Sequence, residues 1–160
     1  MNRLTPLAIR IGAISWLPRF LPQITWLDKT IQRLTRGRWS ILRIAGLPNI
    51  MLTVLGRKSG IPRSTPLLCV PYLRGILIAG SNFGGPTAPV WVVNVRAAQE
   101  KAERVTMRYE GEELAATPVE LTGEDREQAW EHMLATWPNY AKYAERTGRT
   151  IPVFYLEPAA

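Results

Sequence analysis

The spacing of apolar residues changes along the chain close to residue 50. Before this point, Ile24, Leu27, Ile31 and Leu34 recur at helical spacing, which predicts an amphipathic helix over 24–36. After it, short apolar runs bounded by turn residues predict strands over 50–55, 64–73, 75–81 and 151–156, and a hairpin within 105–121. Helical patterns predict further helices over 90–104, 122–137 and 138–148.

The predicted strands outnumber the helices and mostly follow one another. This order favours a small antiparallel barrel with helical additions, a fold that is mainly β with helices (α+β). Pro66 and Pro71 interrupt the run 64–73, which predicts an edge or bulged position for it. We divide the chain into a basic amphipathic N-terminal segment, 1–44, and a barrel domain, 45–160.

The beginning of the chain is apolar but repeatedly interrupted. Residues 1–22 contain Pro6, Pro18, Pro22 and the charged Arg10, so no run approaches the ~20 apolar residues that span a bilayer. Arg10 also falls where a signal peptide requires its apolar region. The protein is therefore expected in the cytoplasm.

The helix predicted over 24–36 carries Lys29, Arg33 and Arg36 on faces other than its apolar one. Two interpretations stay open for it. The helix either packs on its own domain or lies peripherally on an anionic membrane surface, a position that Trp16 and Trp26 would suit.

The net charge of +7 is unevenly distributed. Residues 1–63 hold eleven Lys and Arg against one acid, Asp28, whereas the remainder holds nine against twelve acids. An anion-attracting field therefore belongs to the first part of the chain. Nucleic acid, an anionic membrane and a polyanionic small molecule are the three partner classes that could use it. No RNP-like or helix-turn-helix signature favours nucleic acid.

The chain has one cysteine, Cys69, and one histidine, His132. These numbers argue against a zinc or iron–sulfur centre and against an internal disulfide. Because Cys69 lies in an apolar run, we expect it to be buried as a small hydrophobic residue. The absence of a G-x-S-x-G element disfavours serine hydrolase chemistry.

The densest cluster of positive charge is the turn within LTVLGRKSGIPRSTPLL, residues 52–68. Arg57 and Lys58 lie between Gly56 and Gly60, and Arg63 follows without an intervening acid. Glycines allow backbone N–H groups to converge on an anion, and the cationic side chains add charged donors. The glycine spacing does not match a Walker A loop. The turn is either an anion site or a solvated hairpin tip.

Aromatic residues gather in WPNYAKY, residues 137–143. Tyr140 and Tyr143 are three residues apart on one predicted helix, so their rings project from neighbouring positions, and Trp137 precedes them. Such rings either fill the core or form a wall for a flat, partly polar ligand.

Four motifs in a fixed order give the chain a family resemblance. They are the turn motif above, SN before GG, P-x-W-x-x-N-x-R-A, and WPNYAKYAERTGRTIPVFYLEP, which includes R-T-x-R-x-I-P-V at 146–153. Over roughly 45–158 the chain resembles the deazaflavin (F420)-dependent nitroreductase and quinone reductase family. The resemblance implies a split β-barrel of the FMN-binding-protein type. It also implies coenzyme F420, a hydride carrier of actinobacteria and some archaea, as cofactor.

The resemblance also implies the site residues. F420 carries a phosphodiester and an oligoglutamate tail, which a basic turn suits. The cofactor-binding residues are then Arg57, Lys58, Ser59, Arg63, Ser64, Thr65, Pro66, Leu67, Leu68, Ala79, Gly80, Ser81, Asn82, Val90, Trp91, Val92, Val93, Asn94 and Tyr140. Leu68, Trp137 and Tyr143 are expected to line the acceptor pocket. Ser81, Tyr140 and Tyr143 are the expected catalytic hydroxyls, which hydrogen-bond the acceptor or relay a proton.

The implied activity is hydride transfer from reduced F420 to a quinone or nitroaromatic acceptor. Leu68 stands where some nitroreductase members carry a tyrosine, so quinones are the favoured acceptors. Family members can be membrane-associated without spanning the bilayer. Two alternatives remain, an FMN- or haem-binding split-barrel protein and a non-catalytic F420-binding carrier. No metal is expected, and the oligomeric state is left open.

Overall fold

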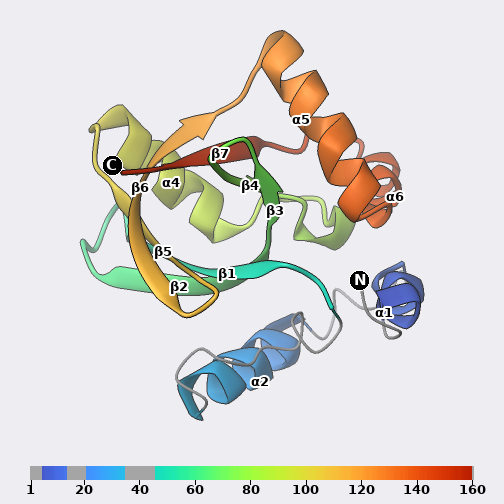
Figure 1. The fold of residues 1–160 in the computed structure, drawn as a ribbon, viewed down its shortest axis with the longest axis horizontal. Helices are drawn as coiled ribbons and strands as arrows, with labels where there is room; N and C mark the ends of the chain where they lie inside the picture. The colour runs from blue at the N-terminus through green and yellow to red at the C-terminus, as the bar shows by residue number, and fades with distance from the viewer. Residues whose placement is uncertain (1–4, 14–20, 35–45, 160) are drawn as a thin grey trace.

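The computed structural model describes residues 5–13, 21–34 and 46–159. Figure 1 shows their arrangement. In chain order the elements are α1 (Thr5–Gly12), α2 (Leu21–Leu34), β1 (Asn49–Leu55), β2 (Pro62–Leu68), β3 (Val70–Tyr72), β4 (Gly75–Ala79), the short 3-10 helix η2 (Asn82–Gly84), α4 (Val90–Glu100), β5 (Val105–Tyr109), β6 (Glu112–Glu120), α5 (Gly123–Thr136), α6 (Asn139–Thr147) and β7 (Val153–Pro158).

The seven strands form one antiparallel sheet in the order β2-β1-β5-β6-β7-β4-β3. The two edge strands, β2 and β3, are consecutive in the chain and are separated only by Cys69. The sheet must therefore curl until its two edges approach each other, which produces a split β-barrel (Figure 1). The predicted fold, a split barrel with flanking helices, is confirmed.

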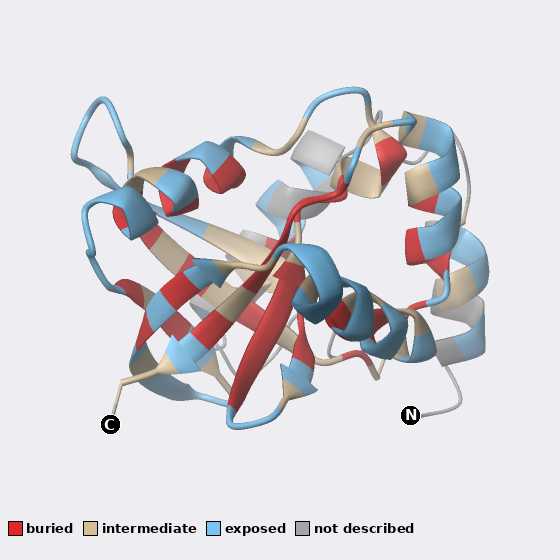
Figure 2. Cartoon of the chain, turned by 90° about the horizontal axis from the view of Figure 1, so that it is seen from above, coloured by how far each residue is buried: buried red, intermediate tan, exposed pale blue. Residues whose placement is uncertain are grey.

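The interior of the barrel follows from the alternation along β1. Ile50, Leu52 and Val54 are buried and pack with Val92 and Val95 of α4 in one cluster. The intervening residues of β1 face the other side, as the alternating burial colours of the strands in Figure 2 show. Helix α4 therefore covers the inner face of the sheet.

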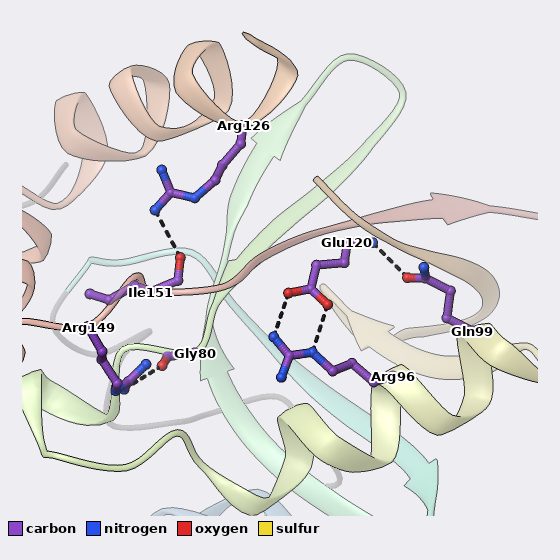
Figure 3. A network of polar contacts seen from close by, with 7 residues as sticks. All are labelled: Gly80, Arg96, Gln99, Glu120, Arg126, Arg149 and Ile151. Atoms are coloured by element: carbon purple, nitrogen blue, oxygen red, sulfur yellow. Dashed lines mark hydrogen bonds and ion pairs between the residues drawn. The ribbon is translucent and has the colours of Figure 1, made fainter. Parts of the chain in front are cut away.

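Polar contacts also attach α4 to strand β6. Arg96 donates to both carboxylate oxygens of Glu120, at 2.7 and 2.6 Å, and the backbone N–H of Glu120 donates to the side chain of Gln99 at 2.7 Å (Figure 3). A bidentate guanidinium–carboxylate pair fixes orientation as well as distance. These bonds hold the helix that carries Trp91 and Asn94 in one position relative to β6.

A second core lies between the sheet and the C-terminal helices. Met133 of α5, Tyr143 of α6 and Leu77 and Val153 of the sheet are buried together there. Helix α6 ends at Gly148, whose φ of 62° is the left-handed conformation that glycine adopts without strain. The chain then enters β7 through Ile151, which is also buried.

Most predicted elements are present, with three differences. The predicted strand over 64–73 is two strands, because β2 pairs with β1 whereas β3 pairs with β4. Pro66 and Pro71 occupy the two edges, as predicted. Helix α1 lies in a region for which no helix is predicted. The short 3-10 helix η2 also lies where no helix is predicted.

Helix α2 agrees with the helix predicted over 24–36, although Arg36 lies outside the described residues. Its predicted apolar face is only partly covered: Leu27 is 47% and Leu34 is 79% exposed, while Ile31 is half-buried. Trp26 is 68% exposed. Helix α2 contacts β2 and so packs on its own domain while it keeps apolar side chains at the surface. Among the described residues, no helix has both the length and the apolar character needed to cross a bilayer.

Candidate functional site

A large hollow surrounds the basic turn between β1 and β2. We call it the basic hollow; its volume is about 1040 Å³. It is lined by Met51, Thr53, Gly56, Arg57, Lys58, Ser59, Pro62, Arg63, Ser64, Thr65, Val90, Trp91, Val93, Asn94, Thr106, Arg108 and Glu113. Its cations outnumber its acid, and the acid is already engaged, because Glu113 accepts from Arg108 at 2.8 Å. The hollow therefore suits an anionic ligand.

The turn itself is held by its own backbone. The N–H of Gly56 donates to the carbonyl of Ile61 at 2.9 Å, and the N–H of Gly60 donates to the carbonyl of Gly56 at 2.7 Å. The N–H of Ile61 donates to the hydroxyl of Ser59 at 3.3 Å. The expectation that several backbone N–H groups of this turn converge on an anion is therefore wrong for these amides, because the fold already uses them.

The turn is also attached to α4. Asn94, which is buried, accepts from the backbone N–H of Arg57 at 3.1 Å. The side chains of Arg57 and Lys58 are exposed and stay available as donors, and Arg63 is exposed beside them. Two guanidinium groups and an ammonium group on a braced turn can bind phosphate or carboxylate oxygens.

A second hollow opens next to the first. We call it the aromatic hollow; its volume is about 670 Å³. It is lined by Trp26, Thr65, Pro66, Leu67, Leu68, Ala79, Ser81, Asn82, Phe83, Thr87, Ala88, Pro89, Val90, Trp91, Trp137, Tyr140 and Tyr143. Thr65, Val90 and Trp91 line both hollows, so the two adjoin. A long ligand with a charged end and a flat end can occupy both.

The rings of the aromatic hollow are packed against one another. The Tyr140 and Tyr143 rings are edge-to-face with centroids 6.2 Å apart, and Phe83 lies 5.6 Å from Tyr143. The fully buried position of Tyr140 raises its pKa far above that of an exposed phenol. Burial raises the pKa of Tyr143 to about 12, although its hydrogen bond with Trp137 and the nearby Arg146 act in the opposite direction. Both phenols therefore stay protonated near neutral pH and serve as hydrogen-bond donors, not as bases.

Ser81 supplies a third hydroxyl at the same place. It is buried where β4 leads into η2, and its side chain makes no hydrogen bond that caps this short helix. Arg149 donates to the carbonyl oxygens of Gly80 at 2.9 Å and of Ser81 at 3.1 Å, and these hydrogen bonds fix the backbone at both residues. Burial also lowers the pKa of the Arg149 guanidinium, which nevertheless stays charged.

Three comparisons with known proteins agree on the family. The family model F420H(2)-dependent quinone reductase matches residues 27–158. The F420H(2)-dependent quinone reductase of Mycobacterium tuberculosis (strain H37Rv) is 33% identical over 144 residues, which cover 88% of this chain and 95% of the relative. The chain belongs to the F420H(2)-dependent quinone reductase family.

Solved structures support the same assignment. An F420-H2 dependent reductase, FDR-A, is 35% identical and superposes with a TM-score of 0.62 over 69% of this chain and 94% of the other. A second structure, described as a domain-swapped dimer, is 32% identical with a TM-score of 0.65, over 82% of this chain and 97% of the other. Members of the F420H(2)-dependent quinone reductase family use coenzyme F420, which is therefore the cofactor of this chain.

The residues present fit this cofactor. The three cations around the turn match the phosphodiester and carboxylates of F420, and the adjoining aromatic hollow matches its flat ring. Gly56 keeps the turn tight, since a Cβ at this position would lie 2.6 Å from the hydroxyl of Ser59 and 3.3 Å from the carbonyl of Ile61. Among the described residues, no group of three or more His, Cys, Asp or Glu is placed to hold a metal ion.

The structure brings most of the residues predicted for this F420-dependent family to the two hollows. The hydroxyl-bearing Ser81, Tyr140 and Tyr143 line the aromatic hollow together with Leu68 and Trp137. Of the residues predicted to bind the cofactor, Gly80 and Val92 line neither hollow. They pack on each other behind the wall, where a Cβ on Gly80 would lie 2.6 Å from Val92.

Sequence reasoning missed two groups of lining residues. Thr106, Arg108 and Glu113 reach the basic hollow because β5 pairs with β1 and β6 follows β5 in the sheet, and the pairing of β1 with β5 has no local signal in the sequence. Trp26 reaches the aromatic hollow from α2, whose packing on β2 is equally non-local. One signal for the contact with α2 was present in the sequence. Pro66 indicates that β2 is an edge strand, and an edge strand leaves room for another element beside it.

Proposed function

We propose that this protein transfers a hydride from reduced F420 to a quinone, with the charged arm of the cofactor in the basic hollow and its flat ring against the acceptor in the aromatic hollow. The observation that carries the proposal is that the two hollows adjoin and share Thr65, Val90 and Trp91 as lining residues. One end of this space is cationic and the other is aromatic, so it complements a molecule with an anionic arm and a flat ring.

In this proposal the turn holds the cofactor. Arg57 and Arg63 grip phosphate or carboxylate oxygens with their planar donor groups, and Lys58 adds a point charge. The hydroxyl of Ser59, which accepts from the N–H of Ile61, still has its own proton to donate to a phosphate oxygen. These residues fix the cofactor without touching the acceptor.

The walls of the aromatic hollow then orient the acceptor. Bound F420H2 supplies the hydride, that is, two electrons and one hydrogen. A quinone that gains this hydride on one atom develops negative charge on a carbonyl oxygen, and one proton completes its conversion to hydroquinone. In this proposal Ser81 and Tyr140, which line the hollow, donate hydrogen bonds to that oxygen, and protonated Tyr143 is a third donor beside them. Phe83 and Trp137 exclude water.

The lining of the aromatic hollow favours quinones over nitroaromatic acceptors. Leu67, Leu68 and Ala79 present apolar surface, and the rings of Trp91 and Trp137 present flat faces. Leu68 offers no hydroxyl to a nitro group. Nitroaromatic compounds are therefore expected to react more slowly.

The proposal is tested by following the absorbance of F420H2 in the presence of menaquinone analogues and nitroaromatic compounds. We expect oxidation with the quinones and slower oxidation with the nitroaromatics. FMN and haem, titrated separately, serve as controls, because the anionic arm should make F420 the tightest ligand. F420 binding without turnover of any acceptor would identify a non-catalytic carrier, and tighter binding of FMN or haem would reject the cofactor arrangement.

The exposed apolar residues of α2 add a peripheral membrane contact to the proposal. Trp26 and Leu34 are 68% and 79% exposed, and Trp26 lines the aromatic hollow. The sequence of this helix also carries Lys29 and Arg33. An apolar face with basic residues suits the surface of an anionic bilayer, where a lipid-soluble quinone would lie close to the hollow.

Vesicle flotation tests this contact on the full chain. We expect the protein to float with vesicles that contain anionic lipid and to stay in solution with neutral ones. A variant with Trp26→Ala and Leu34→Ala should lose flotation, whereas Leu73→Ala, which removes an 83% exposed leucine from the β3–β4 turn, should not. Equal flotation of both variants would exclude α2 as the contact surface.

A further inference from the structure

Arg149 makes an unusual set of contacts that the function described so far does not use. Its Nη2 donates to the carbonyl oxygens of Gly80 at 2.9 Å, Ser81 at 3.1 Å and Thr87 at 3.3 Å, and its Nε donates to that of Gly85 at 3.4 Å. One side chain thus binds both ends of the segment 80–87. Figure 3 shows Arg149, which lies between α6 and β7, with its guanidinium group bonded to the carbonyl of Gly80.

The segment that Arg149 binds is strained. Asn82 and Phe83 are consecutive residues with φ of 48° and 54°, in the left-handed region that residues other than glycine avoid. This conformation is unfavourable above all for Phe83, since asparagine adopts it more readily, so the segment keeps this shape only if its surroundings hold it. Part of this support is internal, since the side chain of Asn82 donates to the carbonyl of Thr87 at 3.0 Å. The N–H of Gly80 donates to the carbonyl of Pro152 at 2.9 Å, and among the described residues the side chains of 146–149 supply the other hydrogen bonds from outside the segment.

Neighbouring residues of the same motif complete the clamp. Thr147 donates to the carbonyl of Gly85 at 2.7 Å, and Arg146 donates to that of Phe83 at 3.0 Å. Gly84 approaches α6 so closely that a Cβ would lie 3.0 Å from the carbonyl oxygen of Tyr143. The motif R-T-x-R thereby attaches segment 80–87 to the helix that carries the two tyrosines.

The clamped segment forms part of the aromatic hollow. Ser81, Asn82, Phe83 and Thr87 all line it, and the ring of Phe83 packs 5.6 Å from that of Tyr143. We propose that Arg149 is a positioning residue, which holds Ser81 and Phe83 in place for the acceptor without touching the acceptor itself. This inference rests on the proposed function, because it assigns the aromatic hollow to the acceptor.

The chemistry of arginine suits this role better than that of lysine. A guanidinium group presents five donors in a rigid plane and reaches several carbonyl oxygens at once, whereas an ammonium group offers three donors around one point. Removing the side chain leaves the carbonyls of Gly80 and Ser81 without this donor, and both residues are buried.

The experiment compares Arg149→Ala and Arg149→Lys with a matched control, Arg126→Ala. Arg126 also donates to a backbone carbonyl, that of Ile151 at 3.0 Å, but it comes from α5 and lines neither hollow (Figure 3). For each protein we would measure amide hydrogen exchange over 80–88, the F420 dissociation constant, and kcat and KM for a menaquinone analogue.

For Arg149→Ala we expect faster exchange at the amides of Gly84 and Gly85, which donate to Ser81 and Asn82. We expect kcat/KM for the quinone to fall about 100-fold, the scale of a misplacement of about 1 Å. The F420 dissociation constant should change less than about 5-fold, because the charged arm binds at the turn. Arg149→Lys should recover part of the turnover, and Arg126→Ala should match the wild type in exchange over 80–88.

Two results would overturn the inference. One is wild-type exchange and turnover in Arg149→Ala, and the other is an equal loss of turnover in Arg149→Ala and Arg126→Ala. If the alanine variant does not fold, Arg149→Lys decides, since wild-type behaviour in that variant also overturns the inference. Failure of the proposed function looks different: the wild type itself would then not oxidise F420H2, while the exchange data would still report on the clamp.

Discussion

The basic and aromatic hollows are adjacent but are built on different physical principles. The cations of the basic hollow, Arg57, Lys58 and Arg63, are exposed side chains on and beside one turn. The rings of the aromatic hollow include Tyr140 and Tyr143, which are 3% and 2% exposed and belong to the second core. One hollow is thus a surface feature and the other is an extension of the interior.

This difference separates two properties of the protein. Charges in water interact over several ångströms, are screened by salt and contribute nearly independently. Packed rings interact only where their atoms are in contact, and a change in one ring displaces its neighbours. We therefore expect cofactor affinity to depend on the turn, and acceptor turnover to depend on the packing around α6.

The largest effect should come from removing the charge of the turn. Arg57→Ala, Lys58→Ala and Arg63→Ala together should weaken F420 binding by about 1000-fold or more, because three charge-assisted hydrogen bonds of roughly 1.5 kcal/mol each amount to about 4.5 kcal/mol. Fluorescence titration would measure this loss, which should shrink at high salt.

A matched control for this change is Lys101→Ala, Arg104→Ala and Lys142→Ala, which removes the same charge from exposed positions outside both hollows. The control should bind F420 nearly as the wild type does. An unchanged affinity in the folded turn variant would contradict the placement of the anionic arm.

The next largest effect should come from the hydroxyls of the aromatic hollow. Tyr140→Phe and Ser81→Ala should each slow single-turnover hydride transfer by roughly 100-fold, the usual loss when a donor to a developing oxyanion is removed. Tyr143→Phe should also slow transfer, since the hydroxyl of Tyr143 accepts from the indole N–H of Trp137 and keeps its own proton to donate. F420 affinity should hardly change in any of them. Unaltered rates in all three variants would reject the catalytic assignment.

The basic hollow was largely predictable because its signals are local. The strand, the two glycines and the cations of 52–63 are consecutive, and a hairpin needs only short-range pairing. The sequence could not show that Asn94 and the turn itself occupy the backbone N–H groups, because the bond from Arg57 to Asn94 joins residues 37 positions apart.

The aromatic hollow was predictable only in part. Tyr140, Tyr143 and Trp137 stood out by their spacing, and the family resemblance indicated Ser81. The clamp at Arg149 did not stand out, although its motif was visible, because its partners lie 62 to 69 positions earlier in the chain. Similarly, the run 64–73 gave no sign that pairing changes from β1 to β4 at Cys69.

A smaller effect should appear in alkaline solution, and it belongs to the aromatic hollow. An unfolded tyrosine ionises near pH 10, whereas burial raises the pKa of Tyr143 to about 12. The folded state thus retains a proton that the unfolded state loses, so this contribution to stability is complete below pH ~10 and is lost as the pH rises towards 12. The loss cannot exceed about 1.4 kcal/mol per pH unit for one tyrosine.

Urea unfolding at pH 9, 10 and 11 would measure this dependence. Burial also raises the pKa of Tyr140 and raises that of Cys69 to about 12. Because both residues are present in the wild type and in Tyr143→Phe, the comparison of these two proteins cancels their contributions. The phenylalanine variant should lose less stability between pH 10 and 11. Parallel curves for the two proteins would show that the phenol of Tyr143 titrates as an exposed one does.

The smallest effect should come from the far side of the basic hollow, where Arg108 and Glu113 form an exposed ion pair at 2.8 Å. Arg108→Ala should weaken F420 binding about 2- to 3-fold, because an exposed charge on the hollow contributes at most ~1 kcal/mol. Glu113→Gln should strengthen binding by a similar factor, since it removes the one acid of the hollow and leaves Arg108 available to a carboxylate of the tail.

Arg104→Ala, which removes an exposed cation outside the hollow, is the control for net charge. If F420 affinity falls in Arg108→Ala and rises in Glu113→Gln, and salt diminishes both changes, then the anionic arm interacts with the whole hollow. If the affinity changes in the same direction in both variants, the contacts of the arm are confined to the turn.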